Sequence, residues 1–122
     1  RTEYEQEMAA ICHKYGLGVI PYSPLAAGFL TGKYRKDRPL PESVRSVSAQ
    51  KHMTVQNWDV LDKLESFGKT RGKSISQMAL GWLLTRQGIT APIIGPRTIE
   101  QLNDNLSAAG LRLSSAEMET LE

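Results

Sequence analysis

Two short apolar stretches decide the fold of this sequence: Leu17-Gly18-Val19-Ile20-Pro21-Tyr22 and, much later in the chain, Ile89-Thr90-Ala91-Pro92-Ile93-Ile94. Largely apolar runs of this length, without polar alternation, are typical of strands that are buried on both faces. Pro21 cannot donate a hydrogen bond to a sheet ladder, so it should lie near the end of its strand. We therefore expect two strands, at 17–22 and 89–94.

Helical patterns surround both stretches. Apolar residues at steps of three and four predict a helix over 3–15, which Gly16 would cap. A second helix should run from about Thr54 to near Gly72. Capping boxes, in which Ser or Thr is followed three residues later by Gln or Glu, predict three more helix starts: Ser74 with Gln77, Thr98 with Gln101, and Ser114 with Glu117. We expect Gly88 to end the third helix and the last helix to be still running where the chain stops.

The apolar faces of these helices follow from the same spacing. In the helix from Thr54 we expect five inward side chains, and in the two helices after it a similar stripe. These residues are Val55, Trp58, Leu61, Leu64 and Phe67, then Ile75, Met78, Ala79, Trp82 and Leu83, then Ile99, Leu102, Leu106 and Ala109.

The order of the elements is helix, strand, a long irregular stretch at 23–53, two helices, strand, helix, helix. Such alternation favours an α/β architecture with parallel strands. Two parallel strands cannot cover their own edges, and parallel sheets need helices on both faces. We therefore expect the chain, residues 1–122, to be a piece of a larger sheet protein, and its start at Arg1 within a helical pattern points the same way.

Composition excludes several classes of function. The formal net charge is only +2, too small to favour a nucleic-acid partner. The basic run Lys33, Arg35, Lys36 and Arg38 is interpreted as a solvated loop, with anion binding by some members as the alternative. The single cysteine, Cys12, permits no intrachain disulfide. No apolar run approaches the length of a membrane span, so we expect no membrane partner and a soluble, cytoplasmic protein without a metal site.

The first candidate site is the loop after the first strand, from Tyr22 to Tyr34. Ligands of parallel α/β proteins gather at the carboxyl ends of strands. An aromatic ring there can stack on a flat ring, while a Ser hydroxyl, exposed backbone amides and Lys33 can hold a diphosphate. The alternative is a plain connector with Tyr22 packed in the core.

The second candidate site lies after the second strand, from Gly95 into the helix that begins at Thr98. A helix N-terminus attracts anions, and Arg97 with the Thr98 hydroxyl would strengthen that attraction. Glu100, in the first turn, opposes it. The alternative is that Thr98 and Gln101 only cap the helix while Arg97 is solvated.

These two segments resemble the aldo-keto reductase family. Gly18-Val19-Ile20-Pro21-Tyr22-Ser23-Pro24-Leu25, running into Gly28-Phe29-Leu30-Thr31-Gly32-Lys33-Tyr34, is similar to the region of the family's seventh strand. Pro92-Ile93-Ile94-Gly95 through Asn105 is similar to its eighth strand and the following helix. The helices and loop lengths between them also fit, so the resemblance covers essentially the whole chain.

The resemblance implies the C-terminal portion of a (β/α)8 TIM barrel that binds NADPH. By position, Tyr22 would stack on the nicotinamide; Ser23, Leu25, Ala26 and Lys33 would line the diphosphate path; Gly95, Arg97, Thr98 and Gln101 would surround the 2'-phosphate; Asp104 and Asn105 would face the adenine. Asp104 departs from the Glu that is common at its position, and its shorter reach weakens that assignment.

The family's catalytic Tyr, Lys, Asp and His belong to the first half of the barrel, so the resemblance implies no catalytic residue in this chain. We expect His13, His52 and the remaining tyrosines to be structural or exposed. The parent enzyme would reduce an aldehyde or ketone with NADPH, and this chain's partner would be the N-terminal half of the barrel. Two alternatives remain: a non-catalytic NADPH-binding regulatory relative, similar to channel beta subunits, and a small module that folds alone.

Overall fold

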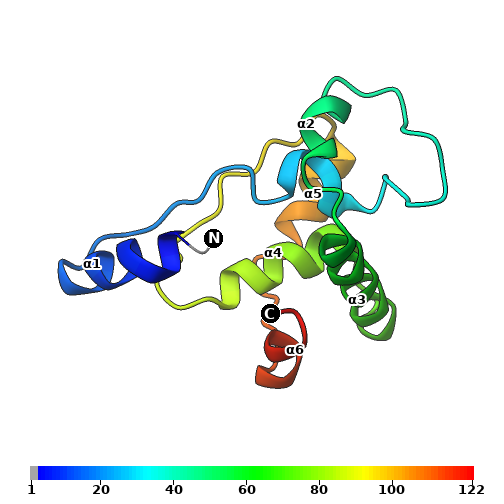
Figure 1. Ribbon diagram of the computed structural model, residues 1–122. Helices are drawn as coiled ribbons and strands as arrows, with labels where there is room; N and C mark the ends of the chain where they lie inside the picture. Colours follow the sequence, from blue (N-terminus) through cyan, green and yellow to red (C-terminus); the bar gives the residue numbers. More distant parts are fainter. Residues whose placement is uncertain (1–2) are drawn as a thin grey trace.

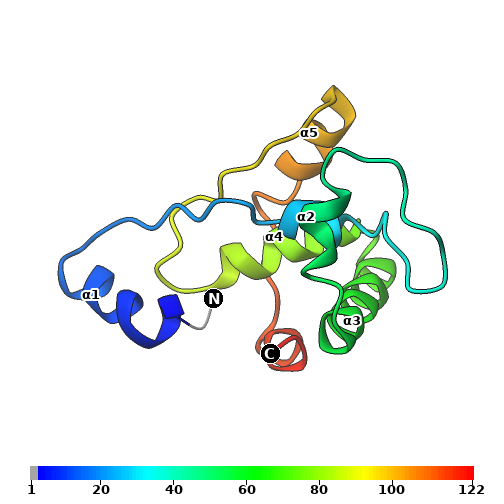
Figure 2. The ribbon, with the colours of Figure 1, turned by 45° about the horizontal axis from the view of Figure 1, so that its top comes forward.

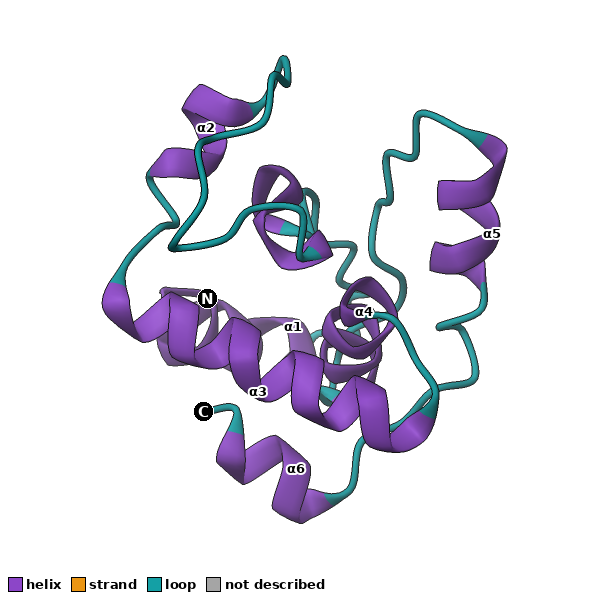
Figure 3. Cartoon of the chain, turned by 90° about the vertical axis from the view of Figure 1, so that its right-hand side faces the viewer, coloured by secondary structure: helices purple, strands orange, loops and turns teal. Residues whose placement is uncertain are grey.

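The computed structural model describes residues 3–122, which are mainly helical (Figures 1 and 3). In chain order the elements are the π-helix η1 (Tyr4–Met8), α1 (Ala9–Lys14), the 3-10 helix η2 (Ala26–Thr31), α2 (Ser46–Gln50), α3 (Val55–Arg71), α4 (Ile75–Thr85), α5 (Ile99–Leu106) and α6 (Ser115–Thr120). The predicted helix at 3–15 therefore begins with a π turn and continues as α1.

The two expected strands form an extended parallel pair but not a regular sheet. The segments run side by side between α1 and α5 in both Figure 1 and Figure 2. They meet at two isolated parallel bridges, Val19 with Ile89 and Tyr22 with Ile93. The Ile93 N–H donates to the Pro21 carbonyl over 2.8 Å. The parallel orientation is thus as predicted, whereas the prediction of full strands is wrong for the residues that the structure describes.

A side chain interrupts the pairing. The Thr90 N–H donates to the Val19 carbonyl at 2.8 Å, but the Val19 N–H donates to the Thr90 hydroxyl at 3.1 Å instead of to a backbone carbonyl. A Cβ at Gly18 would lie 3.0 Å from that hydroxyl oxygen, so glycine leaves it room. Two strands without further neighbours also gain little from a ladder, since a pair alone is marginally stable.

The capping signals placed most helices correctly. Thr54 caps α3 and Gly72 ends it in the left-handed conformation. Ser74 and Ser114 form complete capping boxes with Gln77 and Glu117 at the starts of α4 and α6. Two ends were misplaced: α4 ends at Thr85, before Gly88, and α6 ends at Thr120, before the last residues.

The long stretch at 23–53 is more ordered than the sequence predicted. It contains η2 and α2, and η2 carries the buried Phe29. Its Gly and Pro content masked these short helices. A further correction concerns α3, in which Val55 is 79% exposed because it occupies the first helical position, beyond the packed face.

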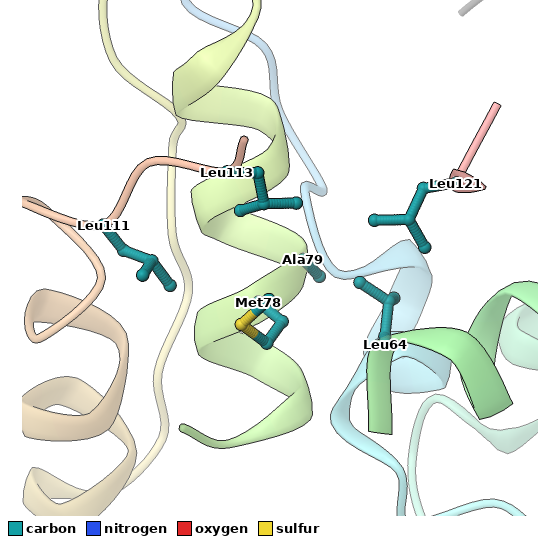
Figure 4. Close-up of a cluster of buried hydrophobic side chains, with 6 residues drawn as sticks. All are labelled: Leu64, Met78, Ala79, Leu111, Leu113 and Leu121. Carbon is teal, nitrogen blue, oxygen red and sulfur yellow. The ribbon is translucent and has the colours of Figure 1, made fainter. Parts of the chain in front are cut away.

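The core consists of two adjoining clusters. The first joins α3 and α4 to the C-terminal segment through Leu64, Met78, Ala79, Leu111, Leu113 and Leu121 (Figure 4). The second packs η2 and α2 on α3 through Phe29, Tyr34, Ala49 and Leu61. The rings of Phe29 and Trp58 meet edge to face with centroids 4.9 Å apart. These clusters fix η2 and the helix α4, from which the site described below is built.

The molecule is open rather than compact. It exposes 8088 Å², whereas a compact protein of this mass exposes about 6,500 Å². Several large apolar side chains are exposed on the first helical segment and on the paired segments, where Tyr15 is 66% and Ile20 is 60% exposed. Similarly, Ile99 and Leu106, which we expected to face inward, are 68% and 55% exposed on α5. No helix within residues 3–122 is long and apolar enough to cross a membrane.

Candidate dinucleotide-binding site

A groove of about 650 Å³ opens where the two paired segments end. Its volume is within the usual range for a small-molecule site. The first segment and η2 form one wall, and the turn into α5 forms the other. The lining residues are Tyr22, Ser23, Pro24, Leu25, Ala27, Gly28, Thr31, Lys33, Arg45, Ser76, Ile93, Ile94, Gly95, Pro96, Arg97, Glu100, Gln101, Asp104 and Asn105.

Tyr22 stands at the end of the first paired segment with 82% of its surface exposed. It is bridged to Ile93, so the residues that follow both segments emerge at the same end of the pair. The alternative in which Tyr22 is packed in the core is therefore wrong. An exposed aromatic ring on a groove wall is suited to stacking on a flat heterocycle.

The backbone after Tyr22 is strained. Ser23, Ala26 and Ala27 all have φ between 50° and 56°, and Gly28 has φ 90°. Non-glycine residues rarely adopt such angles, and each costs about 1–3 kcal/mol, which the surrounding packing must offset. Ala26, Ala27 and Gly28 belong to η2, which the buried Phe29 anchors, and Ala27 and Gly28 line the groove.

Lys33 is held over Gly28 at the groove. Its Nζ donates to the Ser43 hydroxyl at 3.1 Å and lies 5.0 Å from the centre of the buried Tyr34 ring. A Cβ at Gly28 would come within 3.1 Å of Lys33 Cε and 3.2 Å of Nζ. With Lys33 in this position, the contact to an alanine Cβ at residue 28 would be tighter than most such contacts. Of the other basic residues nearby, Arg35 pairs with Glu65 at 3.0 Å, away from the groove.

The second wall is organised by a shifted cap. The Thr98 hydroxyl accepts a hydrogen bond from the Gln101 N–H at 3.2 Å, as a cap should. The side-chain oxygen Oε1 of Gln101, however, accepts a hydrogen bond from the Arg97 N–H at 2.8 Å, whereas a capping box would have it accept from the Thr98 N–H. This bond fixes the Arg97 backbone to the first turn of α5. Within residues 3–122, no carboxylate forms an ion pair with the Arg97 guanidinium.

Asn105 and Asp104 close the groove on the α4 side. Asn105 is only 9% exposed, and no other described residue hydrogen-bonds to its side-chain amide. Asn105 lines the groove, where its amide can form hydrogen bonds with a ligand. The Asp104 carboxylate, in contrast, accepts hydrogen bonds from the Ser74 hydroxyl at 2.8 Å and the Gln77 amide at 3.0 Å.

The structure brings most of the predicted residues together. Nine line the groove: Tyr22, Ser23, Leu25, Lys33, Gly95, Arg97, Gln101, Asp104 and Asn105. Ala26 instead packs against the Phe29 cluster, and Thr98 caps α5 without lining the groove. Arg45, which was not predicted, also lines the groove because the irregular stretch folds back over η2. No periodicity or motif marked that return.

The groove is positively charged overall. It is lined by the cations Lys33, Arg45 and Arg97 and by the anions Glu100 and Asp104. Hydrogen bonds from its own backbone N–H and from the Thr98 hydroxyl hold the pKa of Glu100 below its ordinary value, so this carboxylate stays charged at neutral pH. Neither His13 nor His52 lines the groove, and no cluster of metal-binding side chains occurs in the described part of the chain.

Comparison with known proteins gives a consistent result. The sequence profile of the aldo/keto reductase family matches residues 1–122. An uncharacterized oxidoreductase of Bacillus subtilis is 36% identical over 109 residues, covering 89% of this chain and 32% of its own length. The chloroplastic pyridoxal reductase of Arabidopsis thaliana is 35% identical over 116 residues, 95% of this chain and 31% of the relative.

A third relative extends the pattern to another substrate. The L-glyceraldehyde 3-phosphate reductase of Escherichia coli strain K12 is 36% identical over 115 residues, 88% of this chain and 33% of the relative. The chain thus spans about a third of the length of the curated relatives that it matches.

Proposed function

Since the chain belongs to the aldo/keto reductase family, we propose that it forms the C-terminal, NADPH-binding part of a (β/α)8-barrel reductase that converts aldehydes or ketones to alcohols. The observation that carries this proposal is the common groove of Tyr22 and Arg97, which lie on different segments that end side by side. An elongated dinucleotide needs an aromatic platform at one end and a phosphate-binding cation at the other, and these two residues supply them.

We propose that the remaining barrel strands cover the exposed apolar surface of the paired segments. Ile20 and Ile93 are more than half exposed on the paired segments, although parallel strands are normally buried on both faces. The relatives are about three times as long as this chain, which leaves enough sequence for the other strands. A structure of the full-length protein in which segments 17–22 and 89–94 are not neighbouring strands would contradict this part of the proposal.

The residues present fit the cofactor. Lys33 and Arg45 offer charge to a diphosphate, and the strained loop at 23–28 brings small residues against its path. Arg97 and the N-terminus of α5 offer a site for the 2'-phosphate, and the Asn105 amide can pair with the edge of the adenine. NADPH supplies the hydride when it is bound. The role of this chain is to bind and orient it, and the proton would come from residues outside the chain.

The test compares NADPH with NADH in the full-length protein. Replacing Arg97 with Ala should weaken NADPH binding by about 1–3 kcal/mol, because a charge-assisted contact with the 2'-phosphate is lost. NADH lacks that phosphate and should bind almost unchanged. Both affinities can be measured by calorimetric titration, with Arg38→Ala as a control that removes a positive charge outside the groove.

An equal loss for both cofactors would reject the 2'-phosphate role of Arg97. A wild-type protein that binds neither cofactor would reject the proposed function as a whole.

A further inference from the structure

The helix α5 carries one wall of the groove but has few apolar contacts to hold it. It is only eight residues long, and its one buried residue is polar, Asn105. Ile99 and Leu106 are mostly exposed. A helix of this length is not stable by itself, so its position depends on contacts with its neighbours. Polar contacts must therefore contribute to holding α5 in place.

A closed hydrogen-bond network supplies those contacts. Ser74 and Gln77 form the capping box of α4, in which each side chain bonds the other's backbone N–H at 3.1 to 3.2 Å. The Ser74 hydroxyl then donates to Asp104 Oδ2 at 2.8 Å. The Gln77 amide donates to Asp104 Oδ1 at 3.0 Å and to its backbone carbonyl at 3.2 Å.

The network satisfies each polar group in it. The Gln77 amide uses both its oxygen and its nitrogen, and each Asp104 carboxylate oxygen accepts one hydrogen bond from α4. The negative charge also lies beside the N-terminus of α4, where the helix dipole stabilises an anion. All of these interactions bind Asp104 to the start of α4, and they therefore hold α5 against α4.

The position of α5 determines where two groove residues, Asn105 and Arg97, are placed. Asn105 is the next residue after Asp104, so its amide is placed with the same turn. One turn earlier, Gln101 accepts a hydrogen bond from the Arg97 N–H at 2.8 Å, which places the Arg97 backbone relative to α5. A movement of α5 would therefore displace both Asn105 and Arg97.

We propose that Asp104 is a positioning residue, which locks α5 onto the capping box of α4 and so sets Asn105 and Arg97 for the cofactor, and that it does not itself bind the adenine. This inference rests on the proposed function. It predicts that Ser74, which does not line the groove, affects cofactor binding as Asp104 does.

The experiment titrates the full-length protein with NADPH and with its analogue in which the adenine amino group is replaced by a carbonyl oxygen. The wild type should prefer NADPH, because the Asn105 amide can pair with the amino group. Asp104→Ala should weaken NADPH binding about tenfold and reduce that preference, since α5 loses its hydrogen bonds to a charged group and Asn105 is displaced with it. Ser74→Ala should act in the same direction, and the double variant should lose less than the product of the two single losses.

Ser114→Ala is the matched control. Ser114 forms the same capping box with Glu117 at the start of α6 but has no partner on α5. It should lower thermal stability to a similar degree as Ser74→Ala and leave both affinities unchanged, which separates positioning from a general loss of stability.

Two results would overturn the inference. If Asp104→Ala removes the preference for NADPH over the analogue while Ser74→Ala binds like the wild type, Asp104 contacts the adenine directly. If Ser114→Ala weakens binding as much as Ser74→Ala, the effect is one of stability. Failure of the wild type to bind either ligand would instead reject the proposed function itself.

Discussion

Replacing Gly28 with Ala tests whether the glycine serves to place Lys33. Gly28 has φ +90°, and an added Cβ would lie 3.1 Å from Lys33 Cε and 3.2 Å from Nζ. The Lys33 atoms are the far end of a flexible side chain, so the ammonium group would swing away from Ser43 while the backbone remains. We expect the lysine, not the loop, to move.

We expect one effect on stability and one on NADPH affinity. The strained backbone should cost about 1–3 kcal/mol of unfolding free energy. Displacement of the ammonium group should weaken NADPH binding about tenfold, which corresponds to about 1.4 kcal/mol. That figure is at the low end of a hydrogen bond to a charged group, because Arg45 remains in the groove and offsets part of the loss.

The assay measures NADPH affinity by titration and stability by urea unfolding, both on the full-length protein. Gly72→Ala is the control, since Gly72 has φ +62° with nothing within 4 Å of an added Cβ. It should lose about 1–2 kcal/mol of stability by strain alone and keep its affinity. The Lys33→Met variant should lose affinity to the same extent as Gly28→Ala, without additivity in the double variant. A Gly28→Ala protein that is destabilised like Gly72→Ala but binds NADPH normally would refute the reasoning.

Three further predictions concern single residues. Gly95→Val should weaken NADPH binding severalfold, because Gly95 lines the groove. The melting temperature should not change, because no protein atom lies within 4 Å of an added Cβ. Unchanged affinity in the same titration would show that the cofactor does not approach this turn. Gly81→Ala should lower the melting temperature, since its Cβ would lie 2.8 Å from Leu111 Cγ. Overpacking of this kind costs about 1–3 kcal/mol, which exceeds the gain of about 1 kcal/mol in helix propensity. A higher melting temperature would contradict this packing argument. Hydrogen bonds from Ser114, first its backbone N–H, and the ion pair with Arg71 hold the pKa of Glu117 below its ordinary value, so its contribution is present at neutral pH and lost as the pH falls through that lowered pKa. Glu117→Gln, which can still form a capping box, should therefore show less acid destabilisation than the wild type in urea unfolding at neutral and acid pH, and equal acid sensitivity would contradict this.

The sequence predicted those parts of the fold that depend on local chemistry. Ser74 and Ser114 were correctly identified as caps, because a cap is determined within four residues of the chain. The start of α3 near Thr54 was also predicted. The parallel orientation of the paired segments was also predictable from the alternation of elements. The regular strands were not found, since a ladder depends on neighbouring strands that this pair lacks in residues 3–122.

The candidate site shows the same division. The positions of Tyr22, Lys33 and Arg97 at the groove could be predicted because all three belong to the two motifs that the paired segments lead into. Arg45 could not, because its place depends on a fold-back that carries no periodic signal.

Asp104 is the most informative case, because its position in the motif suggested a ligand contact whereas its hydrogen bonds reach α4. The short side chain of Asp104 explains this difference. A carboxylate on Asp extends one methylene less than one on Glu, so it reaches a neighbouring helix more readily than a ligand across the groove. Whether a residue binds the cofactor or positions the residues that do is then decided by reach and by competing partners. Those partners, Ser74 and Gln77, lie 30 and 27 residues away, and only the folded chain brings them together.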